Sequence, residues 1–543
     1  MSNSVIQISC IIIALLVLSF VGWIAKRRVR IHEDMSVGGR SFNAQKIFVT
    51  LFAFWGGNTI ASIVELAHKD GIVSSWFGIS RMTMLLLIFF ITGGAFRKLA
   101  MITLSDFIAK RFESDFLRLI SGIIIALNFT IFTVSSVVGA AAFFTALLGF
   151  PIWLAVALTV VSFLTYTYLG GMHALASNGK ILAVGQLLSL LVAVIFGLYR
   201  AGWDNVLQLA PRYFEFLPAN YTGTVLMWMF TFCINAFVAQ AALQVVMSCS
   251  SVWEGRKGIL ITAIGFMPII VLAPLAGLAA KVLFPAINSV QAMPMLASHM
   301  PSVFLSTVVL IGLFFTTLGW ASSCILSGGT VSANDIYRYF VPDATSEQLI
   351  RATRVSVVLL SLLTSGFAIM IPSGVEFWTI VGFVLRNCGL FPLIIIGLFW
   401  DLISRKAAIV SALAGSLTGT AWYLIKFPSF LFDAHPMFVG MVVSIIMVVL
   451  ATLYEYRKSI TLRMSRVGVT FSMIGAGMVI FIISQRAVLM DMKLLFPCIS
   501  YAVAFFFVAV VFLFRRADES GLEAPISLAS REPGASGRKV AEE

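Results

Sequence analysis

Long apolar stretches recur along almost the whole chain, with short polar loops between them. A helix needs roughly 20 apolar residues to cross a bilayer about 30 Å thick. Fifteen stretches meet this length, at approximately 5–25, 46–66, 72–96, 118–148, 151–171, 179–199, 223–249, 258–283, 303–329, 353–371, 375–400, 407–425, 437–455, 468–486 and 493–514. The pattern predicts an all-α membrane protein with about 15 transmembrane helices, because a membrane barrel would instead show short alternating strands.

The predicted helices divide into two groups of five, over 46–199 and 223–400. Because each group contains an odd number of helices, the two groups lie in opposite orientations. This is the inverted-repeat plan of many secondary transporters, in which substrate binds near the midplane beside discontinuous helices. Residues 1–45 then form an extra helix and an inner loop, and 401–514 form four peripheral helices. The polar segment 515–543 cannot bury a core and is predicted to be a disordered cytoplasmic tail.

Each group begins with a helix whose apolar run is interrupted. The first carries Gly56, Gly57 and Asn58 halfway along, and the second carries Asn235 and Gln240. Glycine weakens a helix by about 1 kcal/mol relative to alanine, and unwound backbone is tolerated in a membrane only where it lines a cavity or is buried in protein. We therefore expect a broken first helix in each repeat, with the free backbone groups binding solute or ion. The alternative for the glycine pair is a close helix–helix contact.

Composition and charge agree with a membrane protein. Hydrophobic residues make up 60% of the chain and charged residues only 11%, which excludes an ordinary soluble domain. The formal net charge of +13 arises mainly from Lys and Arg in loops that lie inside if the N-terminus is outside, such as 26–45, 97–118 and 333–354. This predicts a multi-pass protein of the cytoplasmic (inner) membrane with a cytoplasmic C-terminus. Its partner is the lipid bilayer and not nucleic acid.

Enzyme chemistry has no support in the sequence. The six cysteines are scattered without CxxC spacing, and the five histidines form no cluster. No nucleophile motif and no nucleotide-binding loop is present. We therefore expect neither catalysis nor a bound cofactor.

Three ionisable residues fall within predicted transmembrane helices. Arg81 lies about nine residues into 72–96, Arg386 is central in its helix, and Glu65 is near the outer end of 46–66. Intramembrane charges are costly and usually functional, and the planar guanidinium fork suits a carboxylate or phosphate. Two arginines against one nearby acid predict an anionic substrate, with a carboxylate as the first choice. A structural ion pair between Arg81 and Glu65 is the alternative.

Aromatic residues support a competing hypothesis. Trp55, with Phe54, Trp76 and Trp228, could enclose a quaternary amine through cation–π contacts. Aromatic residues in membrane helices more often only pack, so we prefer the carboxylate. The residues that we predict to bind substrate are Trp55, Gly57, Asn58, Arg81, Asn235, Gln240 and Arg386.

Six stretches, in the correct order, resemble the sodium/solute symporter family. They are LFAFWGGNTIAS (51–62), TLSDFIAKRFES (103–114), YTYLGGMHAL (166–175), GRKG (255–258), SANDIYRYF (332–340) and GLFPLIIIGLFWDLISRKAAIVSALAGSLTG (389–419). The resemblance extends over roughly residues 36–425. It implies secondary active transport, in which a helix bundle rocks against a scaffold.

The resemblance also implies a sodium site. The family binds the ion with backbone carbonyls of the first core helix, which correspond to Ala53 and Gly56, and with two adjacent hydroxyls on the eighth core helix. An acid that follows the L-G-G motif in the family is linked to sodium. This chain has Ser177, Asn178 and Gly179 in that region instead.

The two hydroxyls are also displaced. Counting back from Asp335 at the family spacing leads to Gly319 and Trp320, which carry none. Thr316 and Thr317 lie about one turn earlier and would serve if the helix carried an insertion of three residues. We therefore keep both sodium and proton as candidate coupling ions, and uncoupled uptake as a further alternative, with Na+ as the one candidate bound ion.

Together these features predict a secondary active transporter that imports a small, carboxylate-bearing organic solute by alternating access, as a monomer or weak homo-oligomer. The alternative is a transporter-like membrane sensor that works with a separate signalling partner. A channel would be expected to repeat pore-lining charges or filter loops, and none is evident.

Overall fold

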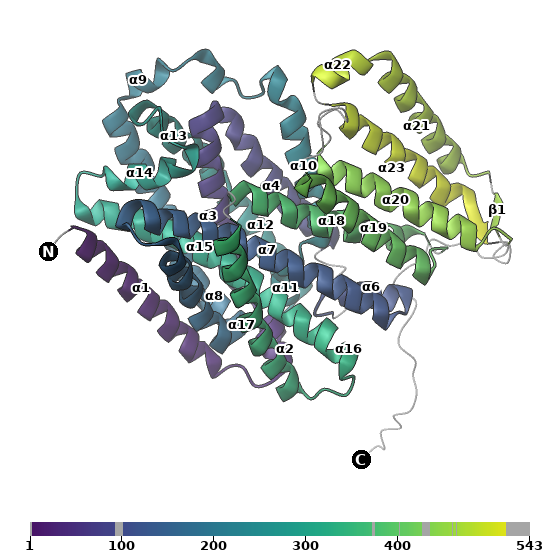
Figure 1. The fold of residues 1–543 in the computed structure, drawn as a ribbon, viewed down its shortest axis with the longest axis horizontal. Coiled ribbons are helices and arrows are strands. Elements are labelled where there is room, and N and C mark those ends of the chain that lie inside the picture. Colours follow the sequence, from purple (N-terminus) through teal and green to yellow (C-terminus); the bar gives the residue numbers. More distant parts are fainter. Residues whose placement is uncertain are drawn as a thin grey trace.

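The structure is a computed structural model that is almost entirely helical (Figure 1). It describes residues 3–92, 101–371, 375–400, 402–425, 435–458, 460–462, 464–492 and 494–516.

The N-terminal region and the first predicted repeat contain the elements α1 (Asn3–Lys26), α2 (His32–Val37), η1 (Gly38–Arg40), α3 (Ala44–Asp70), η2 (Gly71–Ser74), α4 (Ser75–Leu87), the π-helical turn η3 (Ile88–Thr92), α6 (Leu104–Phe112), α7 (Asp115–Leu148) and α8 (Ile152–Ala201). The connection to the second repeat contains α9 (Trp203–Leu207), η4 (Pro211–Phe214) and η5 (Ala219–Tyr221).

The second predicted repeat contains α10 (Thr222–Val238), α11 (Gln240–Met247), α12 (Val252–Gly265), α13 (Met267–Leu283), η6 (Ser289–Gln291), α14 (Ala292–Ser298), α15 (Val303–Val331), the π-helical turn η7 (Ser332–Tyr337), α16 (Arg338–Phe340), α17 (Ser346–Met370) and α18 (Val375–Phe399). The peripheral elements are α19 (Arg405–Leu424), α20 (Pro436–Glu455), β1 (Ile460–Leu462), α21 (Arg466–Ser484), α22 (Arg486–Asp491), α23 (Leu495–Leu513) and β2 (Phe514–Arg516).

The described residues contain 13 helical stretches that are long and apolar enough to cross a membrane. Two of these stretches, 44–91 and 152–201, each contain two of the fifteen predicted helices, so every predicted helix has a counterpart. The chain is therefore a multi-pass helical membrane protein, as predicted.

The long helix α8 shows why two predicted helices merge into one stretch. Its 50 residues would span about 75 Å if straight. Gly171 bends it with φ 50° and ψ −136°, a conformation that glycine adopts at little cost. An ideal Cβ at this position would lie 2.6 Å from the Met35 carbonyl oxygen, so the kink also fits α8 around α2.

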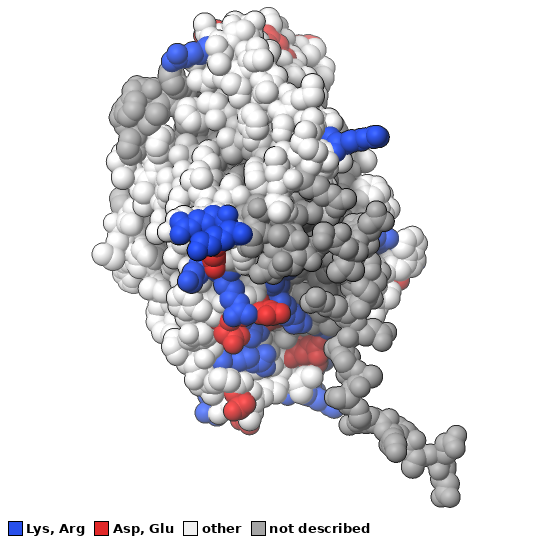
Figure 2. Space-filling view, turned by 90° about the vertical axis from the view of Figure 1, so that its right-hand side faces the viewer, with Lys and Arg blue, Asp and Glu red and all other residues white. Residues whose placement is uncertain are grey.

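The central helices α3, α7, α8, α15 and α18 pack against one another in the middle of the molecule. Figure 1 shows α1 along one side beside α8, and α19 to α23 together on the opposite side. In Figure 2, most Lys, Arg, Asp and Glu side chains of the visible face gather in its lower half. The orientation of the termini stays a prediction.

The structure corrects the expected break in the first repeat. Helix α3 continues through the glycine pair from Ala44 to Asp70. An ideal Cβ on Gly57 would lie 2.5 Å from the Cα of Thr316, so the glycine admits the backbone of α15. Close helix packing, the alternative interpretation, therefore describes Gly57 in this conformation. In the second repeat the break is present, because Ala239 (φ −74°, ψ 72°) separates α10 from α11.

The predicted tail begins in a strand. β2 pairs antiparallel with β1, with Arg516 opposite Ile460. Residues 517–543 of the predicted tail lie outside the described part of the chain.

Candidate functional site

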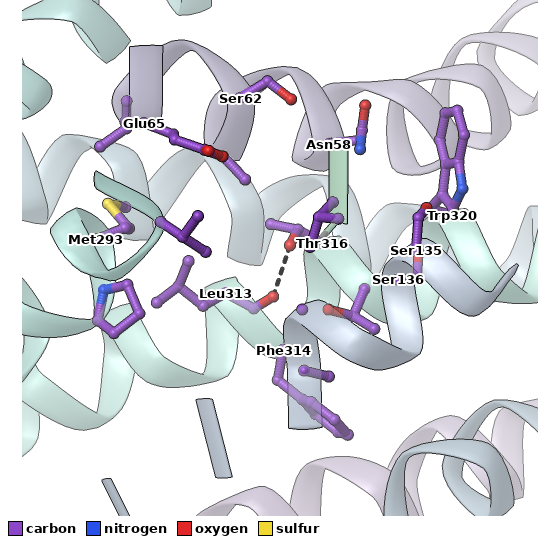
Figure 3. A pocket seen from close by; sticks show the side chains of 18 of the residues that line it. Asn58, Ser62, Glu65, Ser135, Ser136, Met293, Leu313, Phe314, Thr316 and Trp320 are labelled. Atoms are coloured by element: carbon purple, nitrogen blue, oxygen red, sulfur yellow. Dashed lines mark hydrogen bonds between the residues drawn. The ribbon is translucent and has the colours of Figure 1, made fainter. Parts of the chain in front are cut away.

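A cavity of ≈ 120 Å³ lies between α3, α7, α14 and α15 (Figure 3). From α3 it is lined by Asn58, Ser62 and Glu65, which share one helix face because they are four and three residues apart. The polar lining from the other elements is Ser135 and Ser136 of α7, Ser289 of η6, and Thr316 and Thr317 of α15. Trp320 of α15 closes part of the wall. The cavity is therefore lined by hydroxyl, amide and carboxylate groups within a mostly apolar bundle.

Arg81 of α4 lies behind this wall and is 1% exposed. Its Nη1 donates to the Trp55 carbonyl oxygen at 3.2 Å and to Thr59 Oγ1 at 3.0 Å, and its Nη2 donates to Asn58 Oδ1 at 3.3 Å. All three acceptors are on α3, and none carries a charge. The alternative interpretation, a structural ion pair of Arg81 with Glu65, is not found among the described residues. Asn58 both lines the cavity and binds Arg81, so one side chain connects the two.

Arg386 of α18 is 2% exposed and is held by three asparagines. Its Nη1 donates to Asn128 Oδ1 at 3.2 Å, and its Nε and Nη2 donate to Asn387 Oδ1 at 3.1 and 3.0 Å. Nη2 also donates to Asn235 Oδ1. Asn235, which precedes the break in the second repeat by four residues, thus binds one of the two buried arginines.

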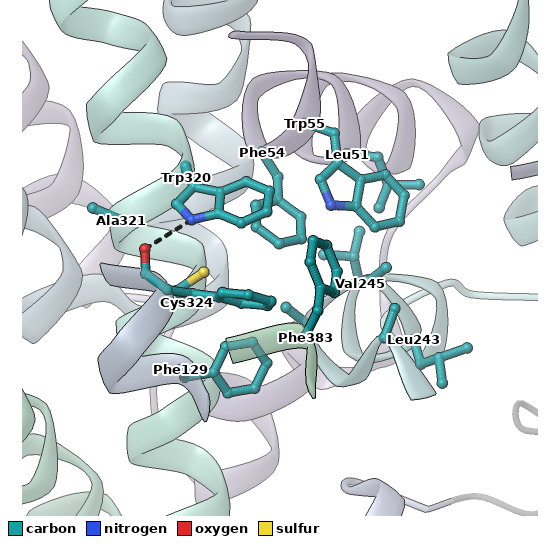
Figure 4. Close-up of a cluster of buried hydrophobic side chains, with 14 of the residues drawn as sticks. Leu51, Phe54, Trp55, Phe129, Leu243, Val245, Trp320, Ala321, Cys324 and Phe383 are labelled. Carbon is teal, nitrogen blue, oxygen red and sulfur yellow. Dashed lines mark hydrogen bonds between the residues drawn. The ribbon is translucent and has the colours of Figure 1, made fainter. Parts of the chain in front are cut away.

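Both arginines contact one group of rings, which we call the aromatic cluster (Phe132, Phe232, Trp320 and Phe383). Ring centroids are 5.5 Å apart for Phe132 and Trp320, 5.0 Å for Phe132 and Phe383, and 6.1 Å for Phe232 and Phe383. The Arg81 guanidinium lies 4.9 Å from Phe232 and 5.7 Å from Trp320, and that of Arg386 lies 5.6 Å from Phe132. Figure 4 shows Trp320, Phe54, Trp55 and Phe383 grouped around one another, and the ring centroids of Phe54 and Trp320 are 4.9 Å apart.

This arrangement leaves two buried positive charges without compensation. Among the residues that the structure describes, neither Arg81 nor Arg386 has an acidic partner. A buried charge is costly unless it is paired. The geometry therefore favours an anion close to the aromatic cluster.

Comparison with known proteins places the chain in a family. The sequence pattern of the sodium:solute symporter family matches residues 36–415. The chain belongs to this family. It is a solute symporter and not an enzyme.

Several curated relatives are similar along most of their length. The chain is 25% identical over 465 residues to the "Uncharacterized symporter YidK" of Escherichia coli (strain K12), covering 78% of this chain and 80% of that protein. It is 22% identical over 435 residues to the "Sodium/proline symporter" of Salmonella typhimurium, covering 74% and 84%. It is 24% identical over 354 residues to the "Sodium/glucose cotransporter" of Vibrio parahaemolyticus, covering 58% and 64%.

One solved structure establishes the fold. A Na+-coupled sialic acid symporter in a substrate-bound outward-open state matches with a TM-score of 0.71 and 17% sequence identity, covering 83% of this chain and 97% of that one. The inverted-repeat fold predicted from the two groups of five helices is thereby confirmed.

The symporter does not have the sodium ligands that its family resemblance implies. An ideal Cβ on Gly319 would lie 2.0 Å from the Ala53 carbonyl oxygen, so the family spacing correctly locates Gly319 at this carbonyl. Thr316 lies one turn away against Gly57, and its hydroxyl donates to the Leu313 carbonyl at 2.7 Å. Within the described residues no hydroxyl of α15 is hydrogen-bonded to the Ala53 carbonyl, and Gly319, which faces it, has no side chain, so the residues present do not fit the implied site.

The other positions that bear on the implied sodium site are Gly56, Trp320 and Thr317. Gly56 packs against its own helix, since an ideal Cβ there would lie 2.9 Å from the ring of Phe52. Trp320 donates its indole N–H to the Phe132 carbonyl at 3.1 Å. Thr317 lines the cavity beside Thr316.

The remaining aromatic candidates do not converge. The ring of Trp55 is 2% exposed and stacks on Phe54 at 5.2 Å. Trp76 donates its N–H to the Phe216 carbonyl at 2.9 Å, whereas Trp228 packs against Phe77. The aromatic residues that line the cavity are Phe314 and Trp320, and the Arg81 guanidinium lies 5.7 Å from the ring of Trp320.

Gln240 lies apart from the cavity and from both arginines. Its Oε1 accepts the N–H of Leu104 at 2.6 Å, and its Nε2 donates to the Ile102 carbonyl at 3.4 Å. It thus holds the start of α6.

Asn128, which binds Arg386, was not among the residues predicted from the sequence. The one feature that could have indicated it is its amide side chain within the apolar run of α7.

Proposed function

We propose that this symporter imports a small organic solute that bears a carboxylate across the cytoplasmic membrane by alternating access. The observation that carries the proposal is the pair of guanidinium groups, which are buried in the bundle and, among the described residues, bonded only to neutral oxygens. Removing such a group from water costs several kcal/mol even after relaxation. Amide and carbonyl oxygens offset part of this cost, and a carboxylate would offset more because it accepts two charge-assisted hydrogen bonds from one fork.

The position of the cavity supports this proposal. Asn58 and Trp320 both line the cavity, and both contact Arg81. A rearrangement of these two side chains would connect the cavity to the guanidinium and to the aromatic cluster. We propose Asn58, Arg81, Asn235 and Arg386 as the polar groups of the substrate site, with the aromatic cluster covering the apolar part of the solute.

A quaternary amine fits this region less well than a carboxylate. Two rings of the aromatic cluster, Phe232 and Trp320, already face the guanidinium of Arg81. An added cation would be repelled by Arg81 and by Arg386, whereas an anion would be attracted to both.

Coupling to an ion gradient follows from the symporter family, and sodium and protons are the two candidate ions. Relatives whose names specify sodium favour that ion. We also propose that the N-terminus is outside and the C-terminus is in the cytoplasm, because Lys and Arg are concentrated in the loops that this orientation places inside.

Binding to matched solute pairs tests the substrate class. The purified protein should be stabilised against thermal unfolding by small carboxylates, but not by the corresponding neutral amides, since the two differ mainly in charge. Removing one partner of a desolvated charge pair costs about 2–5 kcal/mol. Arg386→Gln should therefore weaken carboxylate binding about 30-fold to several thousand-fold, and Arg386→Lys should also weaken it because the fork is lost.

Arg351→Gln is the matched control, because Arg351 forms an ion pair with Glu347 in which both side chains are largely exposed. It should leave binding unchanged. Equal stabilisation by amides or quaternary amines would contradict the proposal, as would normal carboxylate binding by Arg386→Gln.

A further inference from the structure

We infer that the side-chain amide of Gln186 takes the place of a sodium ion between α3 and α15, so that no sodium binds at the position implied by the family resemblance. Gln186 projects from α8 and is fully buried. Its Nε2 donates to the Ala53 carbonyl at 3.2 Å and to the Phe315 carbonyl at 3.1 Å. A single amide nitrogen thus bridges carbonyl oxygens of two helices, as a bound cation would.

The space around this nitrogen is shaped by two glycines. Ideal Cβ atoms would lie 2.8 Å from Gln186 Nε2 at Gly57 and 3.4 Å from it at Gly319. The amide therefore fills the gap that the missing side chains leave. Any hydroxyl at position 319 would require α3 and α15 to separate, since the Cβ itself would collide with the Ala53 carbonyl.

The local charge also favours a neutral donor over a cation. Sodium requires oxygen ligands and compensating negative charge, but the position of the family acid is Gly179, whose ideal Cβ would lie 2.8 Å from the Val49 carbonyl. Arg81 donates to the Trp55 carbonyl, two residues along α3 from Ala53. The Arg81 guanidinium, which has no acidic partner in the described part of the chain, also lies 5.7 Å from the ring of Trp320, the residue that follows Gly319.

The second atom of the amide provides the competing arrangement. Gln186 Oε1 is buried and has no hydrogen-bond partner within the described residues. If the amide were rotated by half a turn, Oε1 would face the carbonyls of Ala53 and Phe315. Three oxygens pointing at one another would need a cation between them, so sodium binding distinguishes the two arrangements.

The experiment measures thermal unfolding of the purified protein without solute, in NaCl and in KCl at equal ionic strength. We expect Gln186 to have no part in any sodium response of the wild type, so the difference in melting temperature between the two salts should be the same in the wild type and in Gln186→Met. Gln186→Glu replaces the amide with a carboxylate and should melt at a higher temperature in NaCl than in KCl, because a carboxylate and two carbonyls form an oxygen site with the required charge. Gln186→Met should keep the wild-type difference between the two salts and should melt lower in both, since two buried carbonyls lose their donor.

A sodium response of the wild type that Gln186→Met abolishes would overturn the inference, and so would the absence of a sodium response in Gln186→Glu. A wild-type response that Gln186→Met retains would place the ion elsewhere and support the inference. Because no solute is used, these outcomes are independent of the proposed carboxylate site.

Discussion

Replacing Gly57 with alanine should push α3 and α15 apart. The ideal Cβ would lie 2.5 Å from both the Cα and the Cβ of Thr316, whereas carbon atoms pack best at about 3.5–4.0 Å. Because the obstructing Cα belongs to the backbone, no rotamer change relieves the contact, and the helices must separate by about 1 Å. Overpacking of this kind costs about 1–3 kcal/mol. The higher helix propensity of alanine returns about 1 kcal/mol, so we expect a net loss of up to about 2 kcal/mol.

Gly366 of α17 is the matched control. An ideal Cβ there meets nothing within 4 Å. Gly366→Ala should therefore be stabilised by the higher helix propensity of alanine without being destabilised by overpacking. The two variants should therefore differ by about 1–3 kcal/mol, read as a lower melting temperature for Gly57→Ala. The larger change Gly57→Leu should abolish uptake while the protein remains in the membrane. Equal melting of the two alanine variants, or wild-type uptake by Gly57→Leu, would refute the reasoning.

Three further predictions concern residues outside the proposed substrate site. Gln240→Leu should lower the free energy of unfolding by about 1–3 kcal/mol, because the N–H of Leu104 loses its acceptor. Its affinity for carboxylates should stay unchanged, and a weakened affinity would show that Gln240 takes part in substrate binding. Asp335→Asn should lower the melting temperature, since the fully buried carboxylate accepts from Arg118 at 3.1 Å; an unaltered melting curve would show that this ion pair contributes nothing. Burial, reinforced by a nearby arginine, lowers the pKa of His32 to about 4, so its contribution to stability is complete above pH 6.5 and falls as the pH is lowered toward 4. His32→Gln should reduce this acid sensitivity, and an identical pH profile would contradict the assignment.

The hydrophobic pattern was sufficient to predict the helices of this protein. A bilayer allows only helices or closed barrels, because every backbone polar group must be bonded inside the segment or barrel. Apolar runs such as 303–329 therefore translate directly into elements such as α15. Arg81 and Arg386 could also be singled out, since a charge within an apolar run is visible in the sequence.

The consequences of the glycine pair could not be predicted in the same way. A glycine in a helix permits either a break or the close approach of another backbone. The choice depends on Thr316 and Gly319, which are more than 250 positions further along the chain. In the second repeat, where Ala239 forms the break, the flanking polar residues gave a correct signal although no glycine is present.

The partners of the buried arginines and of the Ala53 carbonyl also could not be predicted from the sequence. Asn128 and Gln186 are single amides in apolar helices, and nothing in their own segments indicates which buried group each one binds. Their roles follow only from the packing of α7 and α8 against α18, α3 and α15.

The most direct test of the carboxylate proposal is uptake of labelled small carboxylates into proteoliposomes, with sodium and proton gradients imposed separately and with unlabelled competitors. We expect uptake that other carboxylates compete for and that neutral amides and choline do not. It should be lost in Arg386→Gln and retained in Arg351→Gln. Competition by choline, or full uptake by Arg386→Gln, would contradict the conclusion that the buried guanidinium groups hold an anionic solute.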